Sequence, residues 1–314
     1  MASPPSKRRR EWHGQVAPED EDAITPSFWF KDGDIVLAIE DKSCKVHREK
    51  LTCSLIFSDM LDLPQPTDAD NVDGCPSVTL YDLWRDWMVV LEWLYNREYV
   101  TIQLSPFLGK PVIFDSLSGA LRISTKYEIP KLRDWAVSEL LSRWPKELEE
   151  LSTRGLPHAA EAINLARECD VPEILPAAFY ALAIQKWHCY AEGGRSHVIL
   201  GSVDLRRVIS GREGLQDYLL QIVIDPLARS DNPPPPFCAA CVPHLERYWR
   251  ERLTPNATSP YACWLLRDLL AMAKEDGHNP LLQTICAPCS FLHYSLLYDR
   301  MRTLKQSVSR LFQL

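Results

Sequence analysis

The sequence lacks any long hydrophobic run. Its longest nearly continuous apolar stretch, Ile174 to Ile184, has only 11 residues, whereas a membrane-spanning helix needs about 20. The stretch therefore predicts a buried core helix, and we expect no association with membranes. The basic cluster Lys7 to Arg10 is not followed by apolar residues, so we expect no secretory signal either.

The short motifs of common enzyme classes are also missing. Gly109-Lys110 lacks the other residues of a phosphate-binding loop, and the sequence contains neither GxSxG nor HExxH. Cys44 and His47 lie close in sequence, but a nucleophile also needs a placed base and an oxyanion site. We therefore predict a protein that is not an enzyme. His47 is expected to pack inward at a helix start, and Cys53 to be a small buried side chain within that helix.

No strong excess of one charge is present. The chain of 314 residues has 35 basic and 42 acidic side chains, a net charge of −7, so no general attraction to nucleic acid is expected. Without an export signal, the ten cysteines are expected in the reducing nucleus or cytoplasm, where structural disulfides are rare. Lys7 to Arg10 fits either a nuclear import signal or a solvated tail.

The apolar pattern that is present predicts an α+β fold with a helical C-terminal region. Short runs of strand formers occur at Asp34 to Ile39, Ser43 to Val46 and Val78 to Leu80. The segment Pro64 to Pro76, rich in proline and aspartate, predicts an exposed loop. Helical spacing predicts helices at about 51–61, 84–95, 114–127, 130–144, 157–169, 172–187, 212–224, 238–252, 261–275 and 290–312.

This pattern divides the chain into four parts. Residues 1–25 combine proline, serine and charge and are expected to be disordered. An α+β domain is expected at 26–145 and a helical extension at 146–232. A helical, cysteine-containing subdomain is expected at 233–314, after the stiff spacer Pro233 to Pro236.

Three segments of the second part carry a family resemblance. They read DGDIVLAIEDKSCKVHREKLTCSLIFSDML, PSVTLYDLWRDWMVVLEWLYN and LSGALRISTKYEIPKLRDWAVSELL. Over about residues 27–145 the chain resembles a BTB/POZ domain, in the form found in large families of basidiomycete fungal proteins. The resemblance implies a small sheet flanked by helices that serves as a protein–protein interaction module.

The resemblance also implies self-association. Members of the family often form homodimers through the first helix, with a buried Asp–Arg pair near the interface, and Asp34 and Arg48 occupy the matching positions here. An ordinary intradomain or exposed pair is the alternative. Some members recruit a cullin scaffold, but the surface features this requires are not evident in residues 96–111.

Two cysteine pairs stand out in the last part. Cys238 and Cys241, and Cys286 and Cys289, form two C-x2-C pairs separated by 44 residues, each at a predicted helix start. Four such thiolates close the tetrahedral shell of a structural zinc ion. The long spacing leaves two alternatives open, ordinary buried cysteines and a redox dithiol pair. His244 and His293 follow the pairs and could replace a cysteine.

These observations predict a binding protein that self-associates through its BTB domain and acts as an adaptor or scaffold. One alternative is a substrate adaptor of a cullin-type ubiquitin ligase. Another is a zinc-containing, transcription-linked regulator. Arg247, Arg250 and Arg252 lie between the cysteine pairs, but acids and apolar residues interrupt them, so a nucleic-acid partner is not expected.

Overall fold

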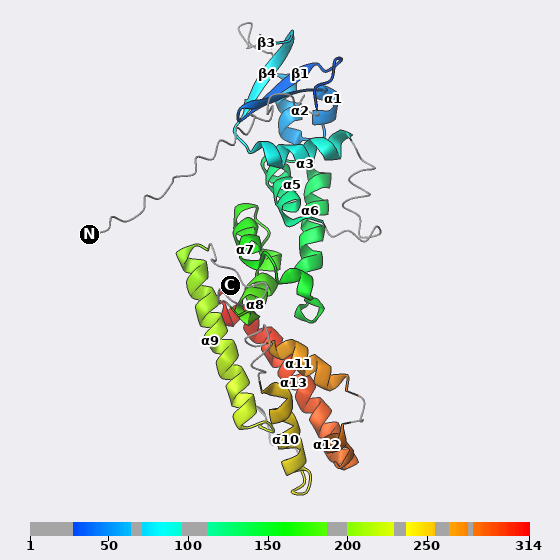
Figure 1. Ribbon diagram of the computed structural model, residues 1–314, viewed down its shortest axis with the longest axis vertical. Coiled ribbons are helices and arrows are strands. Elements are labelled where there is room, and N and C mark those ends of the chain that lie inside the picture. The colour runs from blue at the N-terminus through cyan, green and yellow to red at the C-terminus, as the bar shows by residue number, and fades with distance from the viewer. Residues whose placement is uncertain are drawn as a thin grey trace, which may run out of the picture.

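The computed structural model describes residues 28–63, 71–95, 112–186, 200–228, 237–254, 264–275 and 279–314. The tail 1–25, the segment 96–111 and the spacer Pro233 to Pro236 lie outside the described residues, together with most of the loop predicted after Pro64. Figure 1 shows a small sheet at one end of an elongated molecule and a group of helices at the other end.

The sheet has four strands in the order β2-β1-β4-β3. Strand β1 (Ile35–Ile39) and strand β2 (Lys42–Val46) form an antiparallel hairpin, whose tight turn places Glu40 in the left-handed region at φ 55°. Strand β4 (Cys75–Leu80) runs parallel to β1, and the short β3 (Asn71–Val72) pairs with the start of β4. The predicted strands are therefore confirmed.

The exposed loop that the sequence predicts as far as Pro76 extends too far towards the C-terminus. Asn71 and Val72 pair with Pro76 and Cys75 as a second small hairpin, and Cys75 is buried. Asp73 and Gly74, both with positive φ, make the turn of this hairpin. The sequence signal for a turn was therefore correct, but it marked a hairpin rather than an irregular loop.

Helices pack against this sheet (Figure 1). They are α1 (Arg48–Leu51), α2 (Leu55–Asp62), α3 (Trp84–Tyr95), α5 (Phe114–Lys126) and α6 (Pro130–Arg143). Pro130 stands in the first turn of α6, as predicted, because its missing N–H costs nothing there. At the centre of the core, the ring of Trp87 meets the edges of Phe57 and Tyr127.

The helix predicted at 51–61 is in fact two helices. The helix is interrupted at residues 52–54. There the Ser54 hydroxyl accepts the Phe57 N–H (3.0 Å) and donates to the Tyr127 carbonyl (2.5 Å). The cap thus starts a new helix at Leu55. Cys53 falls in this break and is exposed, so its prediction as a buried residue within a helix was wrong.

The later described residues are mostly helical. Three short 3-10 turns, Leu148–Glu150, Thr153–Gly155 and Pro172–Ile174, accompany α7 (Ala159–Glu168) and α8 (Leu175–Ile184). The later helices are α9 (Ser202–Ile224), α10 (Val242–Leu253), α11 (Leu265–Ala273), α12 (Pro280–Gln283) and α13 (Ala287–Leu311). Only Pro176 of α8 is not fully buried, which confirms the predicted core helix. Within the described ranges, no helix combines the length and apolar character needed to cross a membrane.

Helix α9 begins ten residues before the predicted start at 212. The predicted start follows Gly211 directly, and glycine is unfavourable within helices. In the structure Gly211 lies directly against the ring of Phe312, and a Cβ atom at this position would lie 2.0 Å from the ring. A contact with the far end of the chain, which local sequence does not reveal, explains the glycine.

Two hydrophobic cores meet at α5 and α6. Ala120, Ile123 and Leu132 face the core under the sheet, whereas Leu117 and Leu140 belong to the core of the C-terminal helices. These two helices therefore connect the α+β part to the helical part. The α+β class is confirmed, and α5 and α6 contribute side chains to both cores.

Candidate metal centre

The two cysteine pairs come together where α10 and α13 begin. Cys238 and Cys241 form a tight turn before α10, closed by the bond from the Cys241 N–H to the Cys238 carbonyl (2.9 Å). Cys286 is the residue before α13, and Cys289 lies in the first turn of that helix. Each two-residue spacer thus places both sulfur atoms of a pair on one side, as a metal knuckle requires.

The sulfur positions fit a tetrahedral site. All four Sγ atoms lie within 4.8 Å of one another. Cys286 Sγ is 3.7 Å from Cys241 Sγ and 3.9 Å from Cys238 Sγ. Four sulfurs each about 2.3 Å from a zinc ion would be about 3.8 Å apart. A disulfide needs about 2.05 Å, so the four described cysteines are arranged as ligands and not as bonded pairs.

Backbone N–H groups tie the two pairs to each other. The N–H of Cys238 donates to Cys289 Sγ, and the N–H of Cys286 donates to Cys241 Sγ, both at 3.3 Å. The first residue of each pair therefore supports the second sulfur of the other pair. Such donors stabilise thiolate and orient ligands around a metal.

The thiols of Cys238 and Cys289 differ in pKa when no cation balances them. Hydrogen bonds from the Cys241 thiol and backbone, and from Cys289, lower the pKa of Cys238 to about 7. The Cys238 N–H lowers the pKa of Cys289, but burial and the neighbouring thiols outweigh it and raise this pKa to about 12. One thiolate forms easily, and each further thiolate meets its repulsion. A divalent cation would remove this conflict.

The cluster sits at the surface. Cys241 and Cys289 are only 3% exposed and join the helical core, whereas Cys238 and Cys286 are exposed. The sequence left open that the four were ordinary buried cysteines. That alternative does not hold for Cys238 and Cys286, because both are exposed. The predicted clustering of four cysteines is confirmed. Of the described residues, no histidine joins this group.

The histidine expected as a substitute ligand has another role. His293 is fully buried one turn after Cys289, and its Nδ1 accepts the Trp249 Nε1–H at 3.2 Å. Burial lowers the pKa of His293 to about 4, so the imidazole is neutral. The ring meets Tyr248 and Trp249 edge-on and connects α13 to α10 just below the cysteines. His244 is exposed on α10.

The two predicted interface residues are in contact, through the backbone. Asp34 Oδ1 accepts the Arg48 N–H at 2.7 Å and so holds the first residue of α1. The Nε atom of Arg48 is buried, with no hydrogen-bond partner among the described residues. The Asp34 carboxylate thus fixes the junction between the sheet and α1. Asp34 is exposed, so the pair is not buried as the resemblance implies, and its role at an interface stays a prediction.

The His47 region is an aromatic cluster. The Tyr95 hydroxyl accepts the His47 N–H at 2.8 Å and lies 2.9 Å from His47 Nδ1, while Phe30 stacks on Tyr95 at 4.5 Å. Cys44, nearby in sequence, is fully buried, and burial raises its pKa to about 12. A thiol with that pKa is a poor nucleophile at neutral pH.

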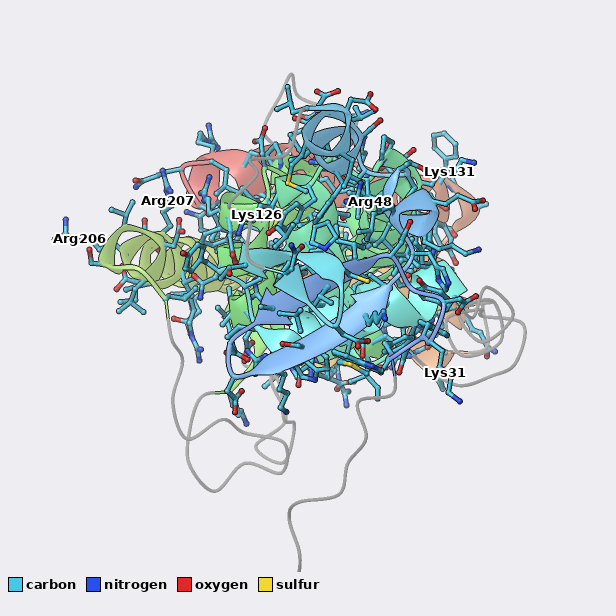
Figure 2. The ribbon with its side chains drawn as sticks, turned by 90° about the horizontal axis from the view of Figure 1, so that it is seen from above. Lys31, Arg48, Lys126, Lys131, Arg206 and Arg207 are labelled. Carbon is cyan, nitrogen blue, oxygen red and sulfur yellow. The ribbon has the colours of Figure 1, made fainter. Side chains whose placement is uncertain are left out.

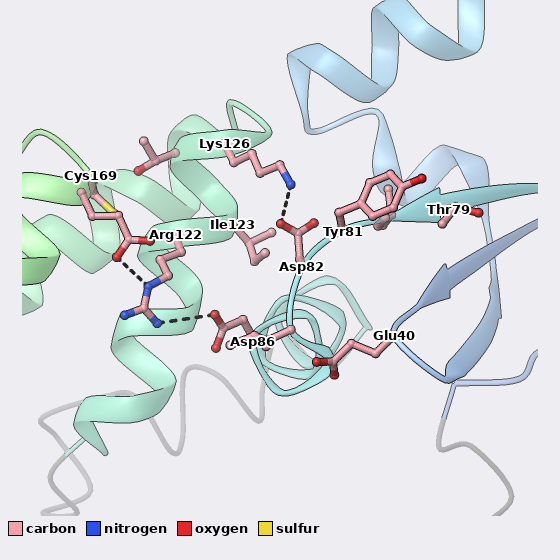
Figure 3. A pocket seen from close by; sticks show the side chains of 13 residues that line it. Glu40, Thr79, Tyr81, Asp82, Asp86, Arg122, Ile123, Lys126 and Cys169 are labelled. Atoms are coloured by element: carbon pink, nitrogen blue, oxygen red, sulfur yellow. Dashed lines mark hydrogen bonds and ion pairs between the residues drawn. The ribbon is translucent and has the colours of Figure 1, made fainter.

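A pocket of about 720 Å³, with several charged residues in its wall, was not predicted from the sequence. Figure 3 shows Arg122 of α5 beside Asp86 of α3, and Lys126 beside Asp82; the N–O distances are 3.5 and 2.6 Å. Arg122 Nε also lies 2.9 Å from a carboxylate oxygen of Glu168 on α7. These ion pairs connect three helices. We interpret these ion pairs as contacts that hold the sheet-bearing part against the helical part. Its residues are far apart in sequence, so no local motif marks them.

No protein-family model matches the sequence, and no curated protein is similar enough to count as a match.

Proposed function

We propose that this chain is a non-enzymatic protein–protein interaction module of the BTB/POZ type. In this proposal, the part at 26–145 self-associates, and the C-terminal helices, held by a structural zinc ion, present the surface that makes the protein an adaptor or scaffold. The proposal rests on the resemblance of the sequence, on the α+β architecture and on the outward face of α2.

The outward face of α2 carries the proposal. Leu55, Ile56 and Leu63 at this helix are exposed, although Phe57 on the opposite side is buried in the core. Leu55, Ile56 and Leu63 lie within about 100° around the helix axis, at 100° per residue. The exposed Asp59 lies on the same side, about 40° from Leu55. An apolar surface that includes a single charge is compatible with a protein interface. The buried Arg48 Nε atom, which has no described partner, lies close by at the start of α1.

Self-association is tested with Ile56→Glu. A second charge on this face, in place of the apolar Ile56, should reduce the oligomer to a smaller species, measured by sedimentation velocity and light scattering. Tyr298→Glu is the control, because Tyr298 is also a large exposed side chain (60% against 41% for Ile56) but lies on α13. An unchanged mass for Ile56→Glu, with circular dichroism identical to wild type, would contradict the use of this face.

The metal is proposed to be zinc, bound by Cys238, Cys241, Cys286 and Cys289. The four thiolates fit zinc best because soft sulfur ligands in a tetrahedron favour it, and a closed shell is structural. Metal analysis should find about one zinc ion per chain. Removal of zinc by a chelator should lower the melting temperature of the C-terminal helices, because metal binding contributes to folding.

Two serine variants sharpen the zinc test. Cys286→Ser should lose zinc and stability, whereas Cys53→Ser, at an exposed cysteine outside the cluster, should retain both. Protein without metal, whose melting is the same before and after chelator and in Cys286→Ser, would refute the proposal. A disulfide in purified protein, detected by mass spectrometry, would favour the redox alternative.

A further inference from the structure

We propose that the outward face of α9 pairs with α9 of a second copy in antiparallel orientation. This interface goes beyond the proposed self-association through the sheet-bearing part, because it uses a different helix and different residues. Figure 1 shows α9 along the outside of the helical part, far from the sheet.

The first observation is a stripe on this helix with two apolar pairs, Leu205 with Ile209 and Leu220 with Ile224. About 16 Å of helix separates the pairs, and Glu213 and Gln216 are exposed there on the same side. Leu205, Ile209, Leu220 and Ile224 are 36%, 46%, 55% and 67% exposed. At 100° per residue they lie within about 100° around the axis, and they span about 28 Å along it. A monomer would leave both apolar pairs in water, and large apolar side chains that are exposed on one side of a helix favour a binding role.

The orientation of the stripe is fixed by the opposite face. Val208, Gly211, Leu215 and Ile222 are buried against the helical core. Gly211 lets the ring of Phe312 approach the helix backbone directly. The helix therefore cannot rotate to bury the outer stripe without losing this packing, so the stripe is available to another molecule.

The charges beside the stripe select a second copy as its partner. Arg206 and Asp217 are both exposed and lie on the same edge of the stripe, about 20° apart around the axis. Figure 2 shows Arg206 pointing away from the molecule, while Arg207 is held by Asp204 at 2.8 Å. In an antiparallel pair related by a two-fold axis, equal edges face each other, and each residue contact occurs twice.

The register follows from these charges. A two-fold axis near Glu213 places Arg206 of one copy within one helical turn of Asp217 of the other, on the same edge. The same register puts Leu205 and Ile209 beside Leu220 of the partner. A parallel pair would place Arg206 against the opposite edge, away from Asp217. Arg206 in the first half of this edge and Asp217 in the second half can therefore pair only in the antiparallel orientation.

One residue disfavours the pair and provides a sharp test. Glu213 is exposed within the stripe and meets its own copy near the axis, where two like charges repel. Glu213→Gln should therefore strengthen association, whereas Ile209→Glu and Leu220→Glu should weaken it by about tenfold or more. Val203→Glu is the matched control, since Val203 is an exposed apolar residue of α9 outside the stripe.

The experiment uses full-length protein that carries Ile56→Glu, so that association through α2 does not contribute. Sedimentation velocity over a dilution series should show a dimer that dissociates in Ile209→Glu and Leu220→Glu, and that is unchanged in Val203→Glu. Arg206→Glu should weaken the dimer, and the double variant Arg206→Glu/Asp217→Arg should restore it. Circular dichroism confirms that each variant is folded.

The possible results distinguish the α9 interface from the α2 interface. A protein that is monomeric at all concentrations in the Ile56→Glu background overturns the α9 pair but leaves the proposed function intact. A dimer that persists in Ile209→Glu also overturns the α9 pair. If Ile56→Glu has no effect on the mass but the α9 variants dissociate the oligomer, the α9 pair stands and the proposed self-association through α2 fails. A charge swap that does not restore the dimer overturns the antiparallel orientation.

Discussion

Substitution of Gly211 by alanine sets two effects of opposite sign against each other. Alanine is favoured over glycine within a helix by about 1 kcal/mol, and Gly211 lies near the middle of α9. On that basis the variant should be more stable than wild type. The added Cβ, however, would lie 2.0 Å from both Cδ1 and Cε1 of Phe312, far closer than van der Waals contact.

The ring cannot move away easily. Phe312 is fully buried, and its centroid lies 5.6 Å from that of Phe179, which is also buried. Overpacking of this kind typically costs about 1–3 kcal/mol, and a clash with a confined ring belongs at the upper end. The steric term therefore exceeds the gain in helix propensity, and we expect Gly211→Ala to lose about 1–2 kcal/mol in the free energy of unfolding.

Urea denaturation, followed by circular dichroism, measures this loss as a lower midpoint at unchanged slope. Gly214→Ala is the matched control, because its Cβ would meet only the end of the flexible, half-buried Leu311 side chain at 2.6 Å. That variant should be neutral or slightly more stable. The double variant Gly211→Ala/Phe312→Leu should be more stable than the sum of the single changes predicts. Gly211→Ala as stable as wild type would refute the docking of α9 on Phe312.

Two further predictions concern other buried polar groups. Because burial lowers the pKa of His293 from 6.5 to about 4, the unfolded chain binds the extra proton between these pH values, and stability should fall by about 3 kcal/mol as pH drops through this range. His293→Gln should remove this part of the pH dependence of unfolding, and an unchanged slope would contradict it. Ser54→Ala should cost about 1–2 kcal/mol in chemical denaturation, since it removes a cap and a buried hydrogen bond. Ser142→Ala, at an exposed hydroxyl, should change stability by less than about 0.5 kcal/mol.

Local patterns were sufficient to predict much of the fold. The alternation and strand formers around Ile35 to Val46 predicted the hairpin, and the apolar stripe of residues 84–95 predicted α3 with its bounds. The spacing of the cysteine pairs predicted their role as one cluster. In each case the signal lies within a few residues, or in residue types whose chemistry restricts the geometry.

The errors arose where a distant contact decides the local structure. The break before Ser54 depends on a hydrogen bond to Tyr127, 73 residues away, and it exposes Cys53. Helix α9 continues through Gly211, which lies against Phe312 at the far end of the chain. The ion pairs of Arg122 with Asp86 and Glu168 likewise connect helices whose contact cannot be read from any local sequence pattern.

The sequence by itself determined the α+β class, the helical C-terminal region and the identity of the four candidate ligands, because these depend on periodicity and on side-chain chemistry. Only the tertiary structure decided that Cys238 and Cys241 reach Cys286 and Cys289, and that each pair donates a backbone N–H to the other. It also decided which apolar side chains of α2 and α9 remain exposed. Burial depends on what packs against a face, and that is set by residues far away along the chain.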